Sequence, residues 1–107
     1  MTSTEPGGPV VVNNEADHRY EIWANGVLAG FADYRARPGR LVFVHTETEP
    51  GFEGHGYASQ LVQAALDDVR ARGLGVTALC PFVAAFIRDH PAYDDLLVKG
   101  EPPDGGG

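Results

Sequence analysis

The chain has 107 residues and a mass of 11.4 kDa, the size of one domain with a single hydrophobic core. Fifteen acidic residues against eight basic ones give a net charge of -7, which argues against nonspecific binding to nucleic acid or an anionic membrane. An acidic surface favours cationic partners such as amines, although solubility is the simpler explanation. The single cysteine excludes an internal disulfide and a Cys-x-x-Cys motif.

The two ends of the chain are polar and rich in glycine and proline. Residues 1–6 contain neither a basic region nor an apolar core, so we expect no secretory signal, and no apolar run approaches the roughly 20 residues that span a bilayer. A soluble, cytoplasmic protein is therefore expected. We predict mobile tails at residues 1–9 and 100–107 around one domain at residues 10–99.

The first half of this domain predicts an antiparallel meander. Residues 19–24 alternate and are rich in strand formers, and Asn25-Gly26 is the strongest two-residue hairpin signal because a type I′ turn needs two positive φ angles. A second strand is expected over residues 27–35. After a turn at residues 37–40, the third strand covers residues 41–46.

The second half predicts a helix, a strand and a helix. From Ala58 to Val69 the apolar residues share the spacing of one helix face, and Gly73 suits the position after its last turn. A short strand at residues 76–79 implies parallel pairing with a right-handed crossover. A second helix is expected from Pro81 to Pro91. The order β-β-β-α-β-α, with one or two short elements added at the ends, predicts an α+β fold with a mixed sheet.

The turn from Gly54 to Ala58 joins the third strand to the first helix and has two interpretations. Its glycines either permit a tight connection or leave backbone N–H groups exposed at a helix start, where they can bind a phosphate. No Lys-Ser/Thr follows, so this is not a Walker loop, and it lacks the three spaced glycines of a dinucleotide fingerprint.

His45 and Cys80 are the candidate reactive side chains. The alternation of a strand places His45 on the face that carries Leu41 and Phe43, where a histidine either packs or catalyses. Cys80 is either an inert buried thiol or, because Pro81 sets a helix start directly after it, a thiol of lowered pKa. If the two strands are neighbours, both residues lie at one edge of the sheet and within reach of each other.

Three segments together resemble a known family: Val44-His45-Thr46, Gly54-His55-Gly56-Tyr57-Ala58 and Leu79-Cys80-Pro81-Phe82. In this order and in a domain of this size, the chain is similar to the minimal YjdJ-type N-acetyltransferases of the GNAT superfamily, over about residues 18–97. The superfamily's pyrophosphate loop reads Gln/Arg-x-x-Gly-x-Gly/Ala. Glu53 departs from it at the first position, which affects a side-chain contact but not the backbone amides.

The resemblance implies an enzyme that uses acetyl-CoA as donor, without a metal. The pantetheine arm would pair as an added strand near Thr46 and Glu47. The implied cofactor-binding residues are Val44, Thr46, Glu47, Gly54, His55, Gly56, Tyr57, Ala58 and Ser59. Because such members lack the helices that close over the acceptor, an open site is expected. A polyamine, a lysine side chain, a protein N-terminus or a small metabolite would each supply the amine.

Two mechanisms remain open. In direct transfer the amine attacks the thioester and His45 acts as general base. In the covalent route Cys80 first takes the acetyl group, activated by His45. Tyr93 either protonates the departing thiolate or packs. A protein that binds CoA or acyl-CoA without turnover, for instance a sensor, is the alternative from another class, and a purely structural module explains these motifs least well.

Overall fold

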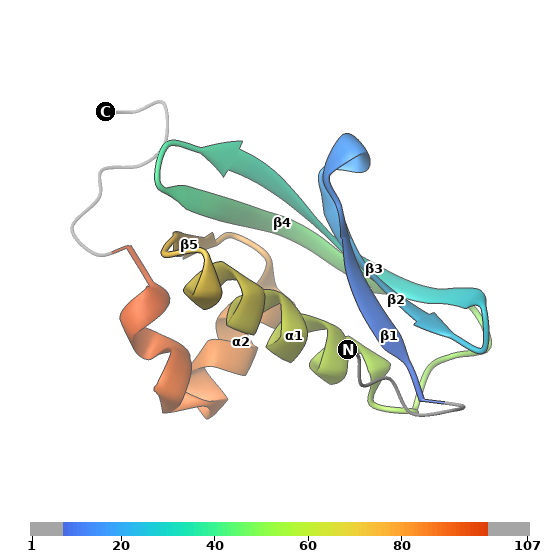
Figure 1. Cartoon of the computed structure of the whole chain (residues 1–107). Helices are drawn as coiled ribbons and strands as arrows, with labels where there is room; N and C mark the ends of the chain where they lie inside the picture. The colour runs from blue at the N-terminus through green and yellow to red at the C-terminus, as the bar shows by residue number, and fades with distance from the viewer. Residues whose placement is uncertain (1–7, 99–107) are drawn as a thin grey trace.

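The structure is a computed structural model that describes residues 8–98 (Figure 1). The predicted tails lie outside this range except for residues 8 and 9. The elements in chain order are β1 (Val10–Asn14), the short 3-10 helix η1 (Glu15–Asp17), β2 (Arg19–Ala24), β3 (Val27–Arg37), β4 (Arg40–Thr48), α1 (Tyr57–Ala71), β5 (Gly75–Ala78), α2 (Pro81–Asp89) and the 3-10 helix η2 (Pro91–Leu96).

One five-stranded sheet carries the fold, with the strands in the order β1-β2-β3-β4-β5. The first four strands pair antiparallel and β5 pairs with β4 in parallel, which confirms the predicted mixed sheet and α+β class. The crossover between the two parallel strands is α1, as expected. Strand β1 and helix η2 are the further short elements at the two ends.

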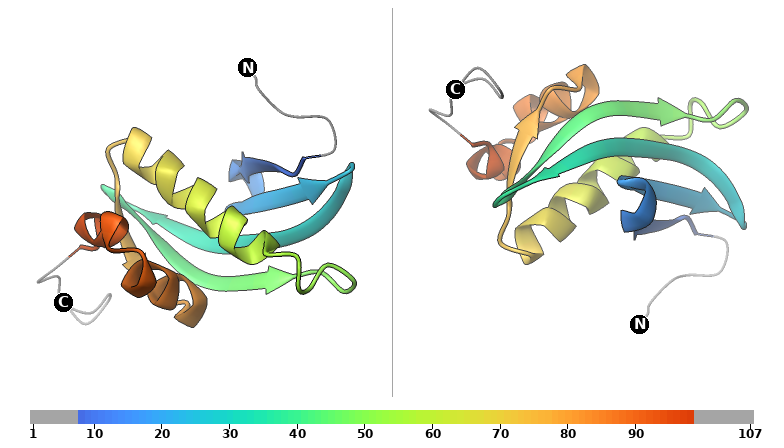
Figure 2. Two further views of the ribbon diagram at one scale, coloured as in Figure 1. Left: turned by 90° about the horizontal axis from the view of Figure 1, so that it is seen from below. Right: turned by 90° about the horizontal axis from the view of Figure 1, so that it is seen from above.

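The two α-helices lie on the same face of the sheet. Figure 1 shows α1 and α2 below the strands and η1 rising above them, and Figure 2 shows the sheet from both sides. The core lies between the helices and this face, with fully buried side chains such as Ile22, Phe43, Leu61 and Leu66. The other side of the sheet is called the open face below. Neither α-helix within residues 8–98 has the length and apolar character needed to cross a membrane.

Local sequence signals explain two of the connections. Asn25 and Gly26 have φ angles of 53° and 79°, the pair of positive values that a type I′ hairpin turn requires. Gly73 follows the last turn of α1 with a φ of 73°. There the N–H groups of Gly73 and Leu74 donate to the carbonyls of Arg70 and Val69, the two bonds of a Schellman motif.

A bulge in β4 changes which side chains face the helices. Along β3, Asp33 pairs with His45 whereas the next residue pairs with Phe43, so Val44 is an extra residue in β4. Beyond the bulge, Thr46 pairs with Ala32 on the helix side, and His45 lies with Asp33 on the open face. The prediction that His45 shares the face of Leu41 and Phe43 is therefore wrong, because the extra residue reverses the alternation.

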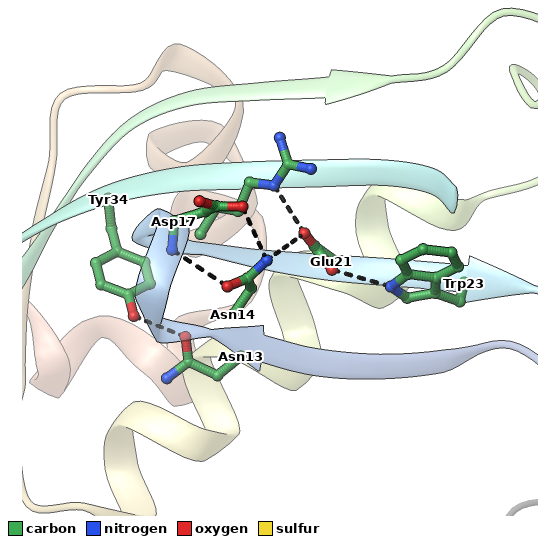
Figure 3. A network of polar contacts seen from close by, with 7 residues as sticks. Asn13, Asn14, Asp17, Glu21, Trp23 and Tyr34 are labelled. Atoms are coloured by element: carbon green, nitrogen blue, oxygen red, sulfur yellow. Dashed lines mark hydrogen bonds and ion pairs between the residues drawn. The ribbon is translucent and has the colours of Figure 1, made fainter. Parts of the chain in front are cut away.

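A polar network covers part of the open face (Figure 3). The Glu21 carboxylate is buried and accepts hydrogen bonds from Asn14 Nδ2, Arg19 Nε and Trp23 Nε1 at 2.9, 2.8 and 3.0 Å. Burial alone would raise the pKa of Glu21, but these three donors outweigh it and lower the pKa. Asn14 also caps η1, because its Oδ1 accepts from the Asp17 N–H.

This network predicts an acid-sensitive contribution to stability. Because the pKa of Glu21 is lower in the folded protein than in the unfolded chain, its contribution is present above the unfolded value, about 4.3, and disappears as the pH falls through the folded value. Glu21→Gln should lower the Tm at neutral pH and flatten the loss of Tm between about pH 5 and pH 3. Thermal unfolding, followed by fluorescence of the single Trp23, measures both effects. Glu49→Gln is the control, and an equal acid dependence in both variants would contradict the assignment.

Candidate functional site

At the start of α1, no side chain accepts a hydrogen bond from the backbone N–H groups. Gly56 is the N-cap, no side chain caps this end, and the first turn contains no acidic residue. The N–H of Gln60 donates to Gly56, so the N–H groups of Tyr57, Ala58 and Ser59 lack an intrahelical acceptor. Unpaired N–H groups at the positive end of a helix attract an anion.

The loop before this helix bends through glycines with left-handed backbone. Gly54 and Gly56 have φ angles of +83° and +75°, and a Cβ built on either one meets no atom within 4 Å. The Glu53 carboxylate accepts a hydrogen bond from the Gly51 N–H at 3.0 Å, so it binds the backbone of its own loop. The His55 ring stacks on Tyr57 with centroids 5.3 Å apart. The departure at Glu53 from the superfamily loop therefore has a structural role within the loop.

Strands β4 and β5 separate before β4 reaches the loop that leads to α1. Their parallel pairing covers Arg40 to Phe43 and Gly75 to Ala78. The N–H groups of both Leu79 and Cys80 then donate to the Phe43 carbonyl, at 3.0 and 2.9 Å. Beyond this point β4 continues to Thr48 with β3 alone beside it, as Figure 2 shows. We call the space beside β4 beyond Phe43 the splay.

The backbone of Thr46 faces the splay. Hydrogen-bonded and non-hydrogen-bonded pairs alternate along antiparallel strands, and the Glu49 N–H donates to the Ala29 carbonyl. Glu49 and Ala29 therefore form a hydrogen-bonded pair, and Glu47, two residues earlier in β4, forms the next such pair with β3. The backbone N–H and C=O groups of the alternate residues, Thr46 and Thr48, point away from β3. Leu79 and Phe82, which follow the end of β5, expose apolar side chains.

The structure does not bring His45 and Cys80 together. Cys80 is buried in the core, and its Sγ donates to Thr46 Oγ1 at 3.3 Å on the helix side of β4. His45 is exposed on the open face, where its Nε2 lies 3.0 Å from Glu47 Oε1 and its ring lies beside Phe31. The expectation that the imidazole activates the thiol fails because the β4 bulge puts the two side chains on opposite faces.

Tyr93 lies in η2 and is engaged with α1. Its hydroxyl donates to Asp67 Oδ1 at 2.7 Å, and the Arg70 guanidinium lies over its ring. The hydrogen bond to Asp67, together with partial burial, raises the pKa of Tyr93. These contacts support the packing alternative for Tyr93.

A groove on the open face was not anticipated from the sequence. Its volume is about 570 Å³, and its lining includes Asp17 and His18 from η1, Asp33 and Arg35 from β3, and the bulge residue Val44. The alternation of polar residues in β3 was visible in the sequence, but the bulge and the position of η1 were not. Among residues 8–98, no group of three or more His, Cys, Asp or Glu side chains is arranged to hold a metal ion.

Comparison with known proteins identifies the family. The model of the GCN5-related N-acetyltransferase family matches residues 19–96, which include every element from β2 to η2. The chain belongs to this family. The family model covers both the α1 start and the splay, so both belong to the GCN5-related domain.

Two relatives agree with the family assignment. Protein NATD1 of Mus musculus is 28% identical over 93 residues, which are 84% of this chain and 84% of that protein. The solution structure of a GCN5-like protein from Staphylococcus aureus superimposes with a TM-score of 0.64 at 18% identity, covering 88% of this chain and 92% of the other. The structural match shows a shared fold. With the family model, these findings confirm the predicted GNAT resemblance and the assignment as an N-acetyltransferase.

Proposed function

We propose that this member of the family transfers an acetyl group from acetyl-CoA directly to an amine, with the open, minimal architecture of YjdJ-type proteins. The observation that carries the proposal is the uncapped start of α1 together with the splay along β4, the strand whose end leads into the α1 loop. A nucleotide diphosphate and an extended amide chain are the two parts of CoA, and the chain offers one matching feature for each.

The pyrophosphate binds to the backbone amides from Gly54 to Ser59. The φ angles of Gly54 and Gly56, and the empty space where their Cβ atoms would stand, allow phosphate oxygens to approach the backbone closely. The first-turn N–H groups of α1 donate to these oxygens. His55, exposed above Tyr57, adds a polar ring at the rim of the loop.

The pantetheine arm lies in the splay and pairs with β4 as an added strand. The backbone groups of Thr46 face this space and form the hydrogen bonds, while Val44 and Glu47 flank them. The exposed apolar side chains of Leu79 and Phe82 cover the aliphatic parts of the arm. The thioester then lies near the bulge, where β4 and β5 part.

His45 is the general base. An alkylammonium has an ordinary pKa of about 10.4 and must lose a proton before its nitrogen can attack. When Nε2 of His45 donates to Glu47, Nδ1 is left to accept this proton. The amine nitrogen bonds to the thioester carbonyl carbon, loses its second proton as the C–S bond breaks, and CoA leaves as a thiolate that takes up that proton. No step needs the Cys80 thiol.

Substitution of His45 and Cys80 separates the two mechanisms. His45→Ala should lower kcat by about a hundredfold or more, the range of general-base catalysis, with an unchanged Kd for CoA. Cys80→Ala should retain most of the turnover, because its thiol contacts Thr46 and not His45. Release of CoA thiol measures turnover, and calorimetry measures CoA binding.

The covalent route makes the opposite prediction. Loss of activity in Cys80→Ala, together with one acetyl group on Cys80 after incubation with acetyl-CoA alone, would contradict direct transfer. A protein that binds CoA but acetylates no amine would instead be the CoA-binding protein or sensor.

A further inference from the structure

The groove on the open face includes a residue from the place where the transfer would occur. Val44, the bulge residue at the edge of the splay, lines it. Asp33 also lines it and is the cross-strand partner of His45 on the same face. Directly opposite side chains on a sheet have Cβ atoms about 5 Å apart, so Asp33 and His45 are neighbours. The groove therefore includes one residue at the edge of the splay and one residue beside the base.

One wall of the groove is held in place by the polar network. Helix η1 rises above the sheet on the open face (Figure 1) and contributes Asp17 and His18. Asn14 fixes η1 by accepting from the Asp17 N–H and donating to both the Asp17 and the Glu21 carboxylates, at 3.1 and 2.9 Å for the two carboxylates (Figure 3). The wall is thus formed before any ligand binds, which reduces the entropy lost on binding.

The groove is lined by charges of both signs. Asp17 and Asp33 provide carboxylates, and Asp33 lies between His45 on β4 and Arg19 on β2, whose guanidinium is paired with Glu21. Arg35 lies two residues beyond Asp33 along the same face of β3, about 7 Å away at 3.4 Å per residue, and lines the same groove. Arg37 also lines the groove. A carboxylate attracts an ammonium group, and a guanidinium binds a carboxylate or phosphate.

From this arrangement we infer that the acceptor is a zwitterion, a primary amine that also carries a carboxylate or phosphate. This inference rests on the proposed function. Asp33 binds the ammonium group that predominates in water, His45 beside it removes the proton, and Arg35 holds the anionic end. A polyamine would place a second ammonium against Arg35 and is disfavoured by repulsion. Arg35 is then a specificity residue for this enzyme.

An amide NMR titration of the full chain tests this inference without requiring turnover. The probes are β-alanine and γ-aminobutyrate, compared with n-butylamine and butyrate, which each lack one of the two charges. At least one zwitterion should shift the amide signals of Asp33, Arg35 and Val44 with a Kd at least tenfold lower than that of either singly charged compound. Arg35→Gln should remove this advantage over n-butylamine. Arg88→Gln, an exposed arginine on α2, should keep it.

Equal affinity for all four probes, tighter binding of n-butylamine, or shifts away from the groove would each overturn the inference. A CoA titration of the same sample keeps the two proposals distinct. If CoA perturbs residues 54–59 and the zwitterions do not bind, the acceptor inference fails alone. If the zwitterions bind and CoA does not, the proposed function fails while the groove remains a zwitterion site.

Discussion

Gly56→Val is expected to raise the Kd for CoA about a hundredfold or more, because the phosphate would lose several charge-assisted hydrogen bonds worth roughly 1.5–3 kcal/mol each. The valine side chain would occupy the empty space above the α1 start, where the structure shows no atom within 4 Å of a Cβ. It would also resist the φ of +75°, since β-branched residues rarely adopt left-handed backbone. Both effects keep the phosphates from the amides.

Gly39→Val provides a matched control. Gly39 has nearly the same φ, +76°, and equally empty surroundings, but it lies in the turn between β3 and β4 and not in the loop that opens α1. The two variants should therefore lose a similar amount of stability through backbone strain, while only Gly56→Val loses CoA affinity in calorimetry. Equal CoA affinity in the two folded variants would show that the pyrophosphate does not bind to this loop.

Phe43→Ala is expected to lower the free energy of unfolding by about 3–5 kcal/mol, the range for truncating a buried phenylalanine to alanine. Phe43 is 1% exposed and packs against the rings of Tyr20 and Tyr34. Its carbonyl also accepts the N–H groups of Leu79 and Cys80, so it stands where β4 and β5 separate. Because a small domain has only about 5–15 kcal/mol of stability, the Tm should fall by more than about 10 °C.

The same deletion at an exposed phenylalanine is the control for this effect. Phe82 is 38% exposed at the start of α2, and Phe82→Ala should cost less than about 1 kcal/mol in denaturant unfolding. A similar loss of unfolding free energy in both variants would show that Phe43 is not central to the core. Phe82→Ala should instead weaken CoA binding, since this exposed residue follows the end of β5 and is proposed to cover the pantetheine arm.

Much of the architecture follows from local chemistry that the sequence displays. Asn25-Gly26 favours a type I′ turn, and this two-residue turn joins β2 to β3 in antiparallel orientation. Gly73 ends α1, and Pro91 ends α2 and opens η2. The uncapped start of α1 could also be predicted from the sequence, because a glycine has no side chain that covers the backbone N–H groups.

The side-chain arrangement of the site could not be predicted, because it depends on one irregularity in the sheet. Strict alternation predicts that His45 shares a face with Phe43, and a single extra residue, Val44, overturns this. No local signal in Phe43-Val44-His45 marks a bulge, since it arises from the pairing of β3 with β4. The groove likewise depends on η1 standing over the open face, which the order of elements does not specify.

If CoA occupies the α1 start and the splay together, an amide NMR titration with acetyl-CoA should detect both contacts at once. The largest shifts should fall on residues 54–59 and on Val44, Thr46 and Leu79, and they should saturate together with a single Kd. Little change is expected on β1, which is separated from the splay by β2, β3 and β4. Shifts at the loop without shifts at β4, or shifts centred on β1 and β2, would show that CoA does not bind to the α1 start and the splay together.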